Sequence, residues 1–69
     1  MRFSYNKLWK LLIDKEMNKQ DLRKKTGISA GTIAKLGKDE NVNTSILLKI
    51  CTALDCDLND IVETVKVCD

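Results

Sequence analysis

Apolar side chains recur at intervals of three and four residues over two long stretches of the chain. Residues 5–15 contain Tyr5, Leu8, Trp9, Leu12 and Ile13, and residues 44–54 contain Leu47, Ile50, Cys51 and Leu54. Because an α-helix makes one turn in about 3.6 residues, each set falls on one face of a helix. The spacing therefore predicts two amphipathic helices whose apolar faces meet in a core. Tyr5 and Trp9 are expected in that core, and not as stacking platforms for a ligand.

Two shorter helices are delimited by capping residues between these stretches. Asn18 is a typical N-cap for a helix over residues 19–26, and Ser29 for a helix over residues 30–37. Gly27 stands where the first of these helices would end in a residue with positive φ. The inward positions of the two helices are Leu22, Thr26, Ile33 and Leu36.

A fifth apolar stripe lies in residues 58–66, behind Asp57 as the expected N-cap. Its members are Leu58, Ile61, Val62 and Val65. A helix is predicted here, although valines would also suit a strand. The chain has no proline and only three glycines, which favours helices over a loop-rich or all-β fold. Together the elements predict an all-α fold, a compact five-helix domain that takes up residues 1–69 as a single unit.

The distribution of charge is uneven along the chain. Residues 1–38 carry ten Lys and Arg against three acidic residues, whereas residues 39–69 carry two against seven. The formal net charge of +2 therefore conceals a basic first half and an acidic second half. This asymmetry is typical of proteins that bind a polyanion. Clustering of charges on an ordinary solvated surface would give the same count.

Several classes of function find no support in the sequence. There is no histidine, and Cys51, Cys56 and Cys68 fit neither a disulfide framework nor a common zinc spacing. We expect Cys51 to be a buried, reduced thiol. No nucleotide-binding loop or nucleophile–base pair is visible, so we expect no enzyme, cofactor or metal, and no small-molecule effector is evident. The absence of a membrane-length apolar stretch and of a signal peptide leads us to expect a cytoplasmic protein.

The run from Lys19 to Leu36 has the spacing of two short helices joined by a tight turn. Gly27 supplies positive φ, Ile28 is the kind of residue that is buried between the helices, and Ser29 caps the second helix. The second helix is then free of the core on one side. Because the major groove of DNA admits an α-helix, the run predicts a DNA-binding helix-turn-helix.

The same run resembles the Cro/CI-type helix-turn-helix family, also called the XRE family. The matching positions are Met17, Asn18, Lys19, Leu22, Thr26, Gly27, Ile28, Ser29, Thr32 and Ile33. Residues 46–54 are similar to the family's fourth helix, and the resemblance extends over about residues 5–62. The opening around Tyr5, Leu8 and Trp9 is similar to a very short, stand-alone subgroup of the VanU type. The resemblance implies a sequence-specific transcriptional regulator, with repression as the expected action and the third helix in the major groove.

The family pattern assigns base contacts to the third helix, at Ala30, Gly31, Thr32 and Lys35. Relatives often carry base-reading amides where Ala30 and Gly31 stand, and neither of these residues has a side chain that donates a hydrogen bond. Ala30 could touch a thymine methyl group, and Gly31 would let the backbone approach closely. For Thr32 and Lys35 we favour base contact over an ordinary exposed position. Discrimination is therefore expected to be modest or to rest partly on DNA shape.

Six further residues are candidate phosphate contacts: Lys19, Arg23, Ser29, Lys38, Asn41 and Asn43. Lys19 replaces the family's Gln and would reach a phosphate as a point charge. Arg23 replaces a small Ala, which puts the close approach of the two helices in doubt unless its stem lies along the surface. For Arg23 and Lys38 the interpretation as a plain solvated charge is equally open. For Asn43 simple capping of the helix is an equally open interpretation. Arg2 could enter a groove as an arm, but we expect a frayed terminus there.

A homodimer is expected on DNA, where two copies would read half-sites about one helical turn apart. The apolar stripe of residues 58–66 is larger than so small a domain needs and could form the interface. Packing of the stripe onto its own core is also open. The rival interpretation is a protein-interaction module on the same scaffold, such as an antitoxin or anti-regulator that uses the acidic residues of 55–69.

Overall fold

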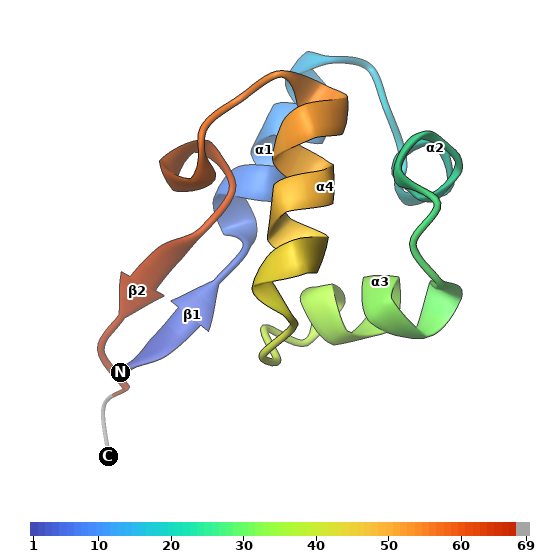
Figure 1. Cartoon of the computed structure of the whole chain (residues 1–69). Helices are drawn as coiled ribbons and strands as arrows, with labels where there is room; N and C mark the ends of the chain where they lie inside the picture. The colour runs from blue at the N-terminus through green and yellow to red at the C-terminus, as the bar shows by residue number, and fades with distance from the viewer. Residues whose placement is uncertain (68–69) are drawn as a thin grey trace.

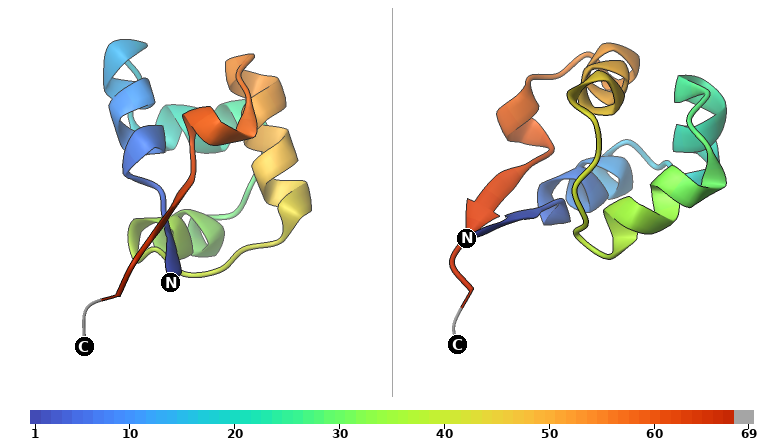
Figure 2. Two further views of the ribbon diagram at one scale, coloured as in Figure 1. Left: turned by 90° about the vertical axis from the view of Figure 1, so that its left-hand side faces the viewer. Right: turned by 60° about the horizontal axis from the view of Figure 1, so that its bottom comes forward.

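The computed structural model describes residues 1–67 as four α-helices, a 3₁₀ turn and a two-stranded sheet (Figures 1 and 2). In chain order the elements are β1 (Arg2–Ser4), α1 (Asn6–Asp14), α2 (Lys19–Thr26), α3 (Ala30–Gly37), α4 (Thr44–Leu54), η1 (Leu58–Asp60) and β2 (Glu63–Val65). The first four predicted helices are present to within one residue at each end, and the mostly helical fold is confirmed. No helix in residues 1–67 is both long and apolar enough to span a membrane.

The fifth predicted helix is reduced to a single turn. Only Leu58–Asp60 is helical, and a capping box that begins at the predicted N-cap Asp57 starts it. The chain is extended again from Glu63 and pairs antiparallel with β1, so that Arg2 lies opposite Val65. β-Branched residues favour this extended form. The partner strand comes from the other end of the chain, where local periodicity gives no information. The terminus is consequently held in a strand and not frayed.

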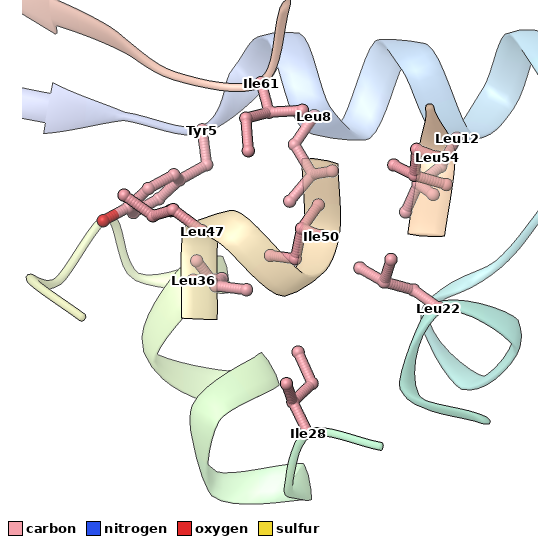
Figure 3. Close-up of a cluster of buried hydrophobic side chains, with 10 residues drawn as sticks. All are labelled: Tyr5, Leu8, Leu12, Leu22, Ile28, Leu36, Leu47, Ile50, Leu54 and Ile61. Carbon is pink, nitrogen blue, oxygen red and sulfur yellow. The ribbon is translucent and has the colours of Figure 1, made fainter. Parts of the chain in front are cut away.

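Ten apolar side chains form the core, and Figure 3 shows how they converge. They are Tyr5, Leu8, Leu12, Leu22, Ile28, Leu36, Leu47, Ile50, Leu54 and Ile61. Leu22, Ile28 and Leu36 belong to the helix-turn-helix segment and point towards α4 and its Ile50 (Figure 3). Burial of Leu or Ile contributes about 1.5–3 kcal/mol per side chain. These three residues therefore fasten α2 and α3 to the rest of the molecule.

The buried face of α1 is narrower than its apolar stripe predicts. Tyr5, Leu8 and Leu12 are buried, whereas Ile13 is 73% exposed. Each residue of a helix is rotated by about 100° from the one before, so the residue after Leu12 turns towards solvent. Trp9 is only partly buried at the edge of the core, which leaves part of its ring for other contacts.

The turn between α2 and α3 has the geometry that the sequence predicts. Gly27 has φ of 75°, and its N–H donates to the carbonyl of Arg23 at 2.8 Å. Ile28 follows it into the core, and Ser29 then caps α3 by accepting a hydrogen bond from the backbone N–H of Thr32. A left-handed glycine, an apolar anchor and a cap thus fix the angle at which α3 leaves α2.

The other three helix ends use left-handed residues that are not glycine. These residues are Glu16, Asp39 and Asp55. After each one, the next N–H bonds back to the carbonyl five residues earlier, as in the Schellman motif. The three bonds are Met17 N to Leu12 O (2.8 Å), Glu40 N to Lys35 O (3.0 Å) and Cys56 N to Cys51 O (3.0 Å). Each helix therefore stops sharply although no glycine is present to signal it.

The carboxylate of Asp39 ties the end of α3 to the N-terminal strand. It accepts a hydrogen bond from the backbone N–H of Tyr5 at 3.1 Å and pairs with the Arg2 guanidinium at 2.7 Å. The hydroxyl of Tyr5 also donates to the carbonyl of Glu40 at 2.9 Å. The hydrogen bond from Tyr5, and then the contact with Arg2, lower the pKa of Asp39 below its ordinary value. Both ends of α3 are thus fixed, one by the turn and one by this carboxylate.

Gly27→Val is expected to destabilise the fold by about 1–2 kcal/mol, because a β-branched residue is strained at positive φ. A Cβ at this position would meet no atom within 4 Å, so the loss reports backbone strain and not a clash. Thermal unfolding measures it. Gly31→Ala is the matched control: in α3 it should raise stability by up to about 1 kcal/mol. An unchanged midpoint for Gly27→Val would contradict the turn.

Asp39→Asn is expected to lower stability at neutral pH while keeping the left-handed backbone, which Asn tolerates well. Because folding lowers the pKa of Asp39, its ionised form stabilises the fold above the unfolded pKa, near 3.9, and this contribution is lost as pH falls through the folded pKa. The difference in melting temperature between the two proteins should therefore narrow below about pH 4. A constant difference from pH 7 to pH 3 would rule out a role for the charge.

Candidate nucleic-acid interface

Helix α3 lies across one end of the molecule with one side open to solvent (Figures 1 and 2). Leu36 is buried and Ile33 is partly buried on its inner side. The exposed residues of the helix are Ala30, Gly31, Ala34, Lys35 and Gly37. Apart from Lys35 these residues are small, so a flat, narrow surface faces outward with one long cationic side chain on it. Such a surface allows the helix backbone to come close to the floor of a groove.

Thr32 is partly buried, and its hydroxyl lies next to the cap of its own helix. It is 3.0 Å from the hydroxyl oxygen of Ser29, which also accepts the hydrogen bond from the backbone N–H of Thr32 at 3.2 Å. If Ser29 donates its proton to Thr32, the hydroxyl of Thr32 keeps its own proton for an outside acceptor. Ser29 therefore caps α3 and also holds the hydroxyl of Thr32 in place.

A shallow depression of about 80 Å³ lies between α2 and α3. Its lining residues are Lys19, Gln20, Arg23, Ala30 and Ile33. Arg23 replaces a small Ala of the family, and its length put the close approach of α2 and α3 in doubt. The small Ala30 across the depression leaves space for it, and the side chain of Arg23 remains exposed. Gln20 was missing from the sequence-based candidates, and its amide is the nearest equivalent of the family's Gln that Lys19 replaces.

The ammonium group of Lys19 joins three elements at one point. Its Nζ lies 4.8 Å from the centroid of the Trp9 ring, which is a cation–π contact with α1. A Cβ built on Gly37 would lie 3.6 Å from the same Nζ, so the ammonium group also adjoins the last residue of α3. Trp9 is therefore more than the core residue that the sequence predicts, because its partly exposed ring positions the cation.

The remaining candidates lie around the loop between α3 and α4. Lys38 directly follows α3 and is exposed. Asn43 occupies the N-cap position of α4, but its side chain makes no capping hydrogen bond, so it stays free. Asn41 lines a different hollow with Arg2 and Phe3 of β1 and lies apart from the α2–α3 depression. The structure thus gathers Lys19, Arg23 and Ala30 at one place and leaves Asn41 away from it.

The helix-turn-helix segment carries a strong excess of positive charge. Residues 19–38 contain six cations, Lys19, Arg23, Lys24, Lys25, Lys35 and Lys38, and one acid, Asp21. One carboxylate oxygen of that acid accepts a hydrogen bond from the backbone N–H of Asn18 at 3.0 Å, at the start of α2. The only acidic group of this segment is therefore held at a helix N-terminus, and the cations give the segment its field.

Comparison with known proteins agrees with this geometry. The sequence profile of the Cro/C1-type HTH DNA-binding domain matches residues 7–66, which is most of the chain. The chain belongs to the Cro/C1-type helix-turn-helix family. The matched residues include α2, α3 and α4 in full and all of α1 except its first residue, with α2 and α3 as the helix-turn-helix pair. DNA is therefore the partner of this fold, as the sequence predicts.

One solved structure is similar along nearly the whole length. The chain is 60% identical to transcriptional regulator VanUg in its crystal Form II, with a TM-score of 0.87 over 90% of this chain and 83% of that chain. The predicted resemblance to VanU-type members of the Cro/C1-type family is confirmed. No curated protein matches the sequence significantly.

Proposed function

We propose that this Cro/C1-type protein is a sequence-specific repressor that inserts α3 into the major groove of its operator. The observation that carries the proposal is the open face of α3, where small residues surround Lys35 beside a strongly basic α2. A DNA-binding domain of this size can repress transcription by occupying its operator. The acidic residues lie mainly outside this segment, so the basic face meets the phosphate backbone without strong repulsion.

Base contacts are proposed for the exposed side of α3. Lys35 has the length to reach O6 or N7 of a guanine, and Thr32 can donate its proton to a base acceptor when Ser29 is the donor in the bond between the two hydroxyls. Ala30 offers a methyl group for thymine, and Gly31 allows close approach of the backbone. With so few side-chain donors, part of the specificity would come from the shape of the groove.

Phosphate contacts are proposed on both sides of that helix. Lys19 and Arg23 stand at the α2–α3 depression, and Lys38 follows the end of α3. The uncapped N-terminus of α4, with the free side chain of Asn43, is an additional phosphate site. Ser29 supports the surface through Thr32. Asn41 would contribute only if the DNA bends towards β1.

Lys35→Ala and Lys19→Ala are expected to weaken DNA binding in different ways. Loss of Lys35 should cost about 1–3 kcal/mol on the preferred site and little on a site altered at the contacted base. Loss of Lys19 should weaken all duplexes alike and reduce the salt slope by about one ion. Matched and altered duplexes, first selected from a random pool, are titrated at several salt concentrations.

Lys10→Ala is the control for these variants. It removes the same charge from α1, in a hollow shared with Asn59 and Asp60 of η1 and not with α3, and should change affinity little. Thermal melts of the Lys19 variant separate loss of the Trp9 contact from loss of a phosphate contact. Equal losses on both duplexes would make Lys35 a phosphate contact. Failure of the unaltered chain to bind any duplex in a salt-dependent way would instead favour a protein-interaction module.

A homodimer on DNA is the second part of the proposal. The stripe that the sequence offered as an interface is divided in the fold, because Ile61 is fully buried in the chain's own core. Leu58 is 51% exposed and is the member of the stripe that remains available to a partner. Leu48 on α4 is also exposed and lines the same hollow as Leu58, so an apolar surface is present there.

Sedimentation of the complex with a palindromic operator is expected to show two chains per duplex. Leu58→Ser should reduce the cooperativity of binding and leave the affinity for a single half-site unchanged, because Leu58 lies on η1 and outside the α2–α3 surface. One chain per duplex at saturation would rule out the dimer.

A further inference from the structure

Two cysteines, five residues apart in the sequence, lie close together at the C-terminal end of α4. Cys51 is in the last turn of the helix, and Cys56 follows Asp55, the left-handed residue that ends it. Both are free thiols, and both are partly buried. This end of α4 is the one farther from α3 (Figure 1), so the pair is separate from the proposed DNA-binding surface.

The backbone holds these two cysteines close together. The N–H of Cys56 donates to the carbonyl of Cys51 at 3.0 Å. A carbonyl oxygen lies about 2.4 Å from its own Cα, and a backbone nitrogen about 1.5 Å from its own, so the two Cα atoms are at most about 7 Å apart. Disulfides join Cα atoms that are about 4.4–6.8 Å apart. In a Schellman motif the side chains of these two positions are frequently in contact.

The two side chains interact and are reachable from solvent. Burial, and then the neighbouring Cys51 thiol, raise the pKa of Cys56 to about 11; Asp60 adds to the rise and Lys15 opposes it. The thiol of Cys51 contributes to this raised pKa, so the two side chains are close enough to affect each other. Both cysteines line an open hollow of about 290 Å³ together with the exposed side chains of Leu48 and Leu58. A small molecule can therefore approach the pair.

We propose that Cys51 and Cys56 form a reversible dithiol site that reacts with small disulfides of the glutathione class. The Cys51 thiolate attacks one sulfur of the small disulfide, its S–S bond breaks, and one small thiol leaves with a proton. Cys56 then loses its proton and attacks the sulfur of Cys51, which releases the second small thiol. The protein loses two electrons and two protons, and these reduce one small disulfide to two thiols.

The raised pKa of Cys56 suits it to the second step. With a pKa raised to about 11, very little of Cys56 is thiolate at neutral pH, so it is a poor first nucleophile. Once Cys51 is bound in a mixed disulfide, it can no longer be a neighbouring thiolate or accept a hydrogen bond from Cys56, and two causes of the raised pKa are removed. Cys56 is therefore suited to the second, resolving step. A packing role alone would make both thiols slow and independent.

The folded chain is treated with glutathione disulfide, its remaining thiols are alkylated, and it is cut with trypsin. Cleavage after Lys49 and Lys66 places both cysteines on one peptide, residues 50–66, and separates Cys68 from them. We expect that peptide to lose two hydrogens and to carry no alkyl group. Products that link it to Cys68, or a fully alkylated peptide after long exposure, would overturn the proposal.

Two variants in a Cys68→Ser background test the assigned roles. Cys56→Ser should retain glutathione on Cys51 as a stable mixed disulfide, while Cys51→Ser should react at least about tenfold more slowly. Circular dichroism establishes that each variant is folded. Equal rates for the two variants would contradict the order of attack.

Formation of the disulfide between Cys51 and Cys56 is then measured in denaturant. Unfolding removes the hydrogen bond that holds the two residues together, so ring closure should slow by at least about tenfold. If the unfolded chain closes as fast as the folded one, proximity in sequence is sufficient and the site is not built by the fold.

Discussion

The left-handed turn at Gly27 is the constraint on which the rest of the structure depends. With φ of 75° at this residue, the chain reverses direction at once and places Ile28 in the core and Ser29 at the start of α3. Leu22 on one side of the turn and Leu36 on the other are fully buried against the same core. The angle between α2 and α3 is therefore set by backbone geometry and by three apolar anchors, while the outer face of α3 takes no part in folding.

The far end of α3 is held by a contact between distant parts of the chain. Asp39 accepts from Tyr5 and pairs with Arg2, so the strand at the N-terminus braces the loop that follows α3. That strand is in turn held by β2. A helix fixed at both ends presents its surface with little reorganisation when it binds. For the proposed contact with DNA this matters because Ala30 and Gly31 have little or no side chain with which to reach a base.

The sequence predicts features that depend on residues close together in the chain, and it misses contacts between residues far apart. Asn18, Gly27 and Ser29 signal caps and turns within a few residues, and all three have the predicted roles. The contact of Arg2 with Asp39 and the pairing of β1 with β2 join residues far apart in the chain, so no local pattern reveals them. The position of Lys19 over the Trp9 ring is likewise set by how α1 and α2 pack. The space that the small Ala30 leaves for the long side chain of Arg23 is also set by how α2 and α3 pack.

Three helices of this fold end at a left-handed residue that is not glycine. A left-handed backbone strains an ordinary residue by about 1–2 kcal/mol, and an acidic group at a helix C-terminus is repelled by the helix dipole. At Asp39 the side chain offsets this through its bonds to Tyr5 and Arg2. At Asp55 the motif instead brings Cys51 and Cys56 together. Strained residues of this kind persist where the surrounding structure holds them. The two motifs thus serve opposite ends of the molecule: one braces α3, and the other positions a thiol pair.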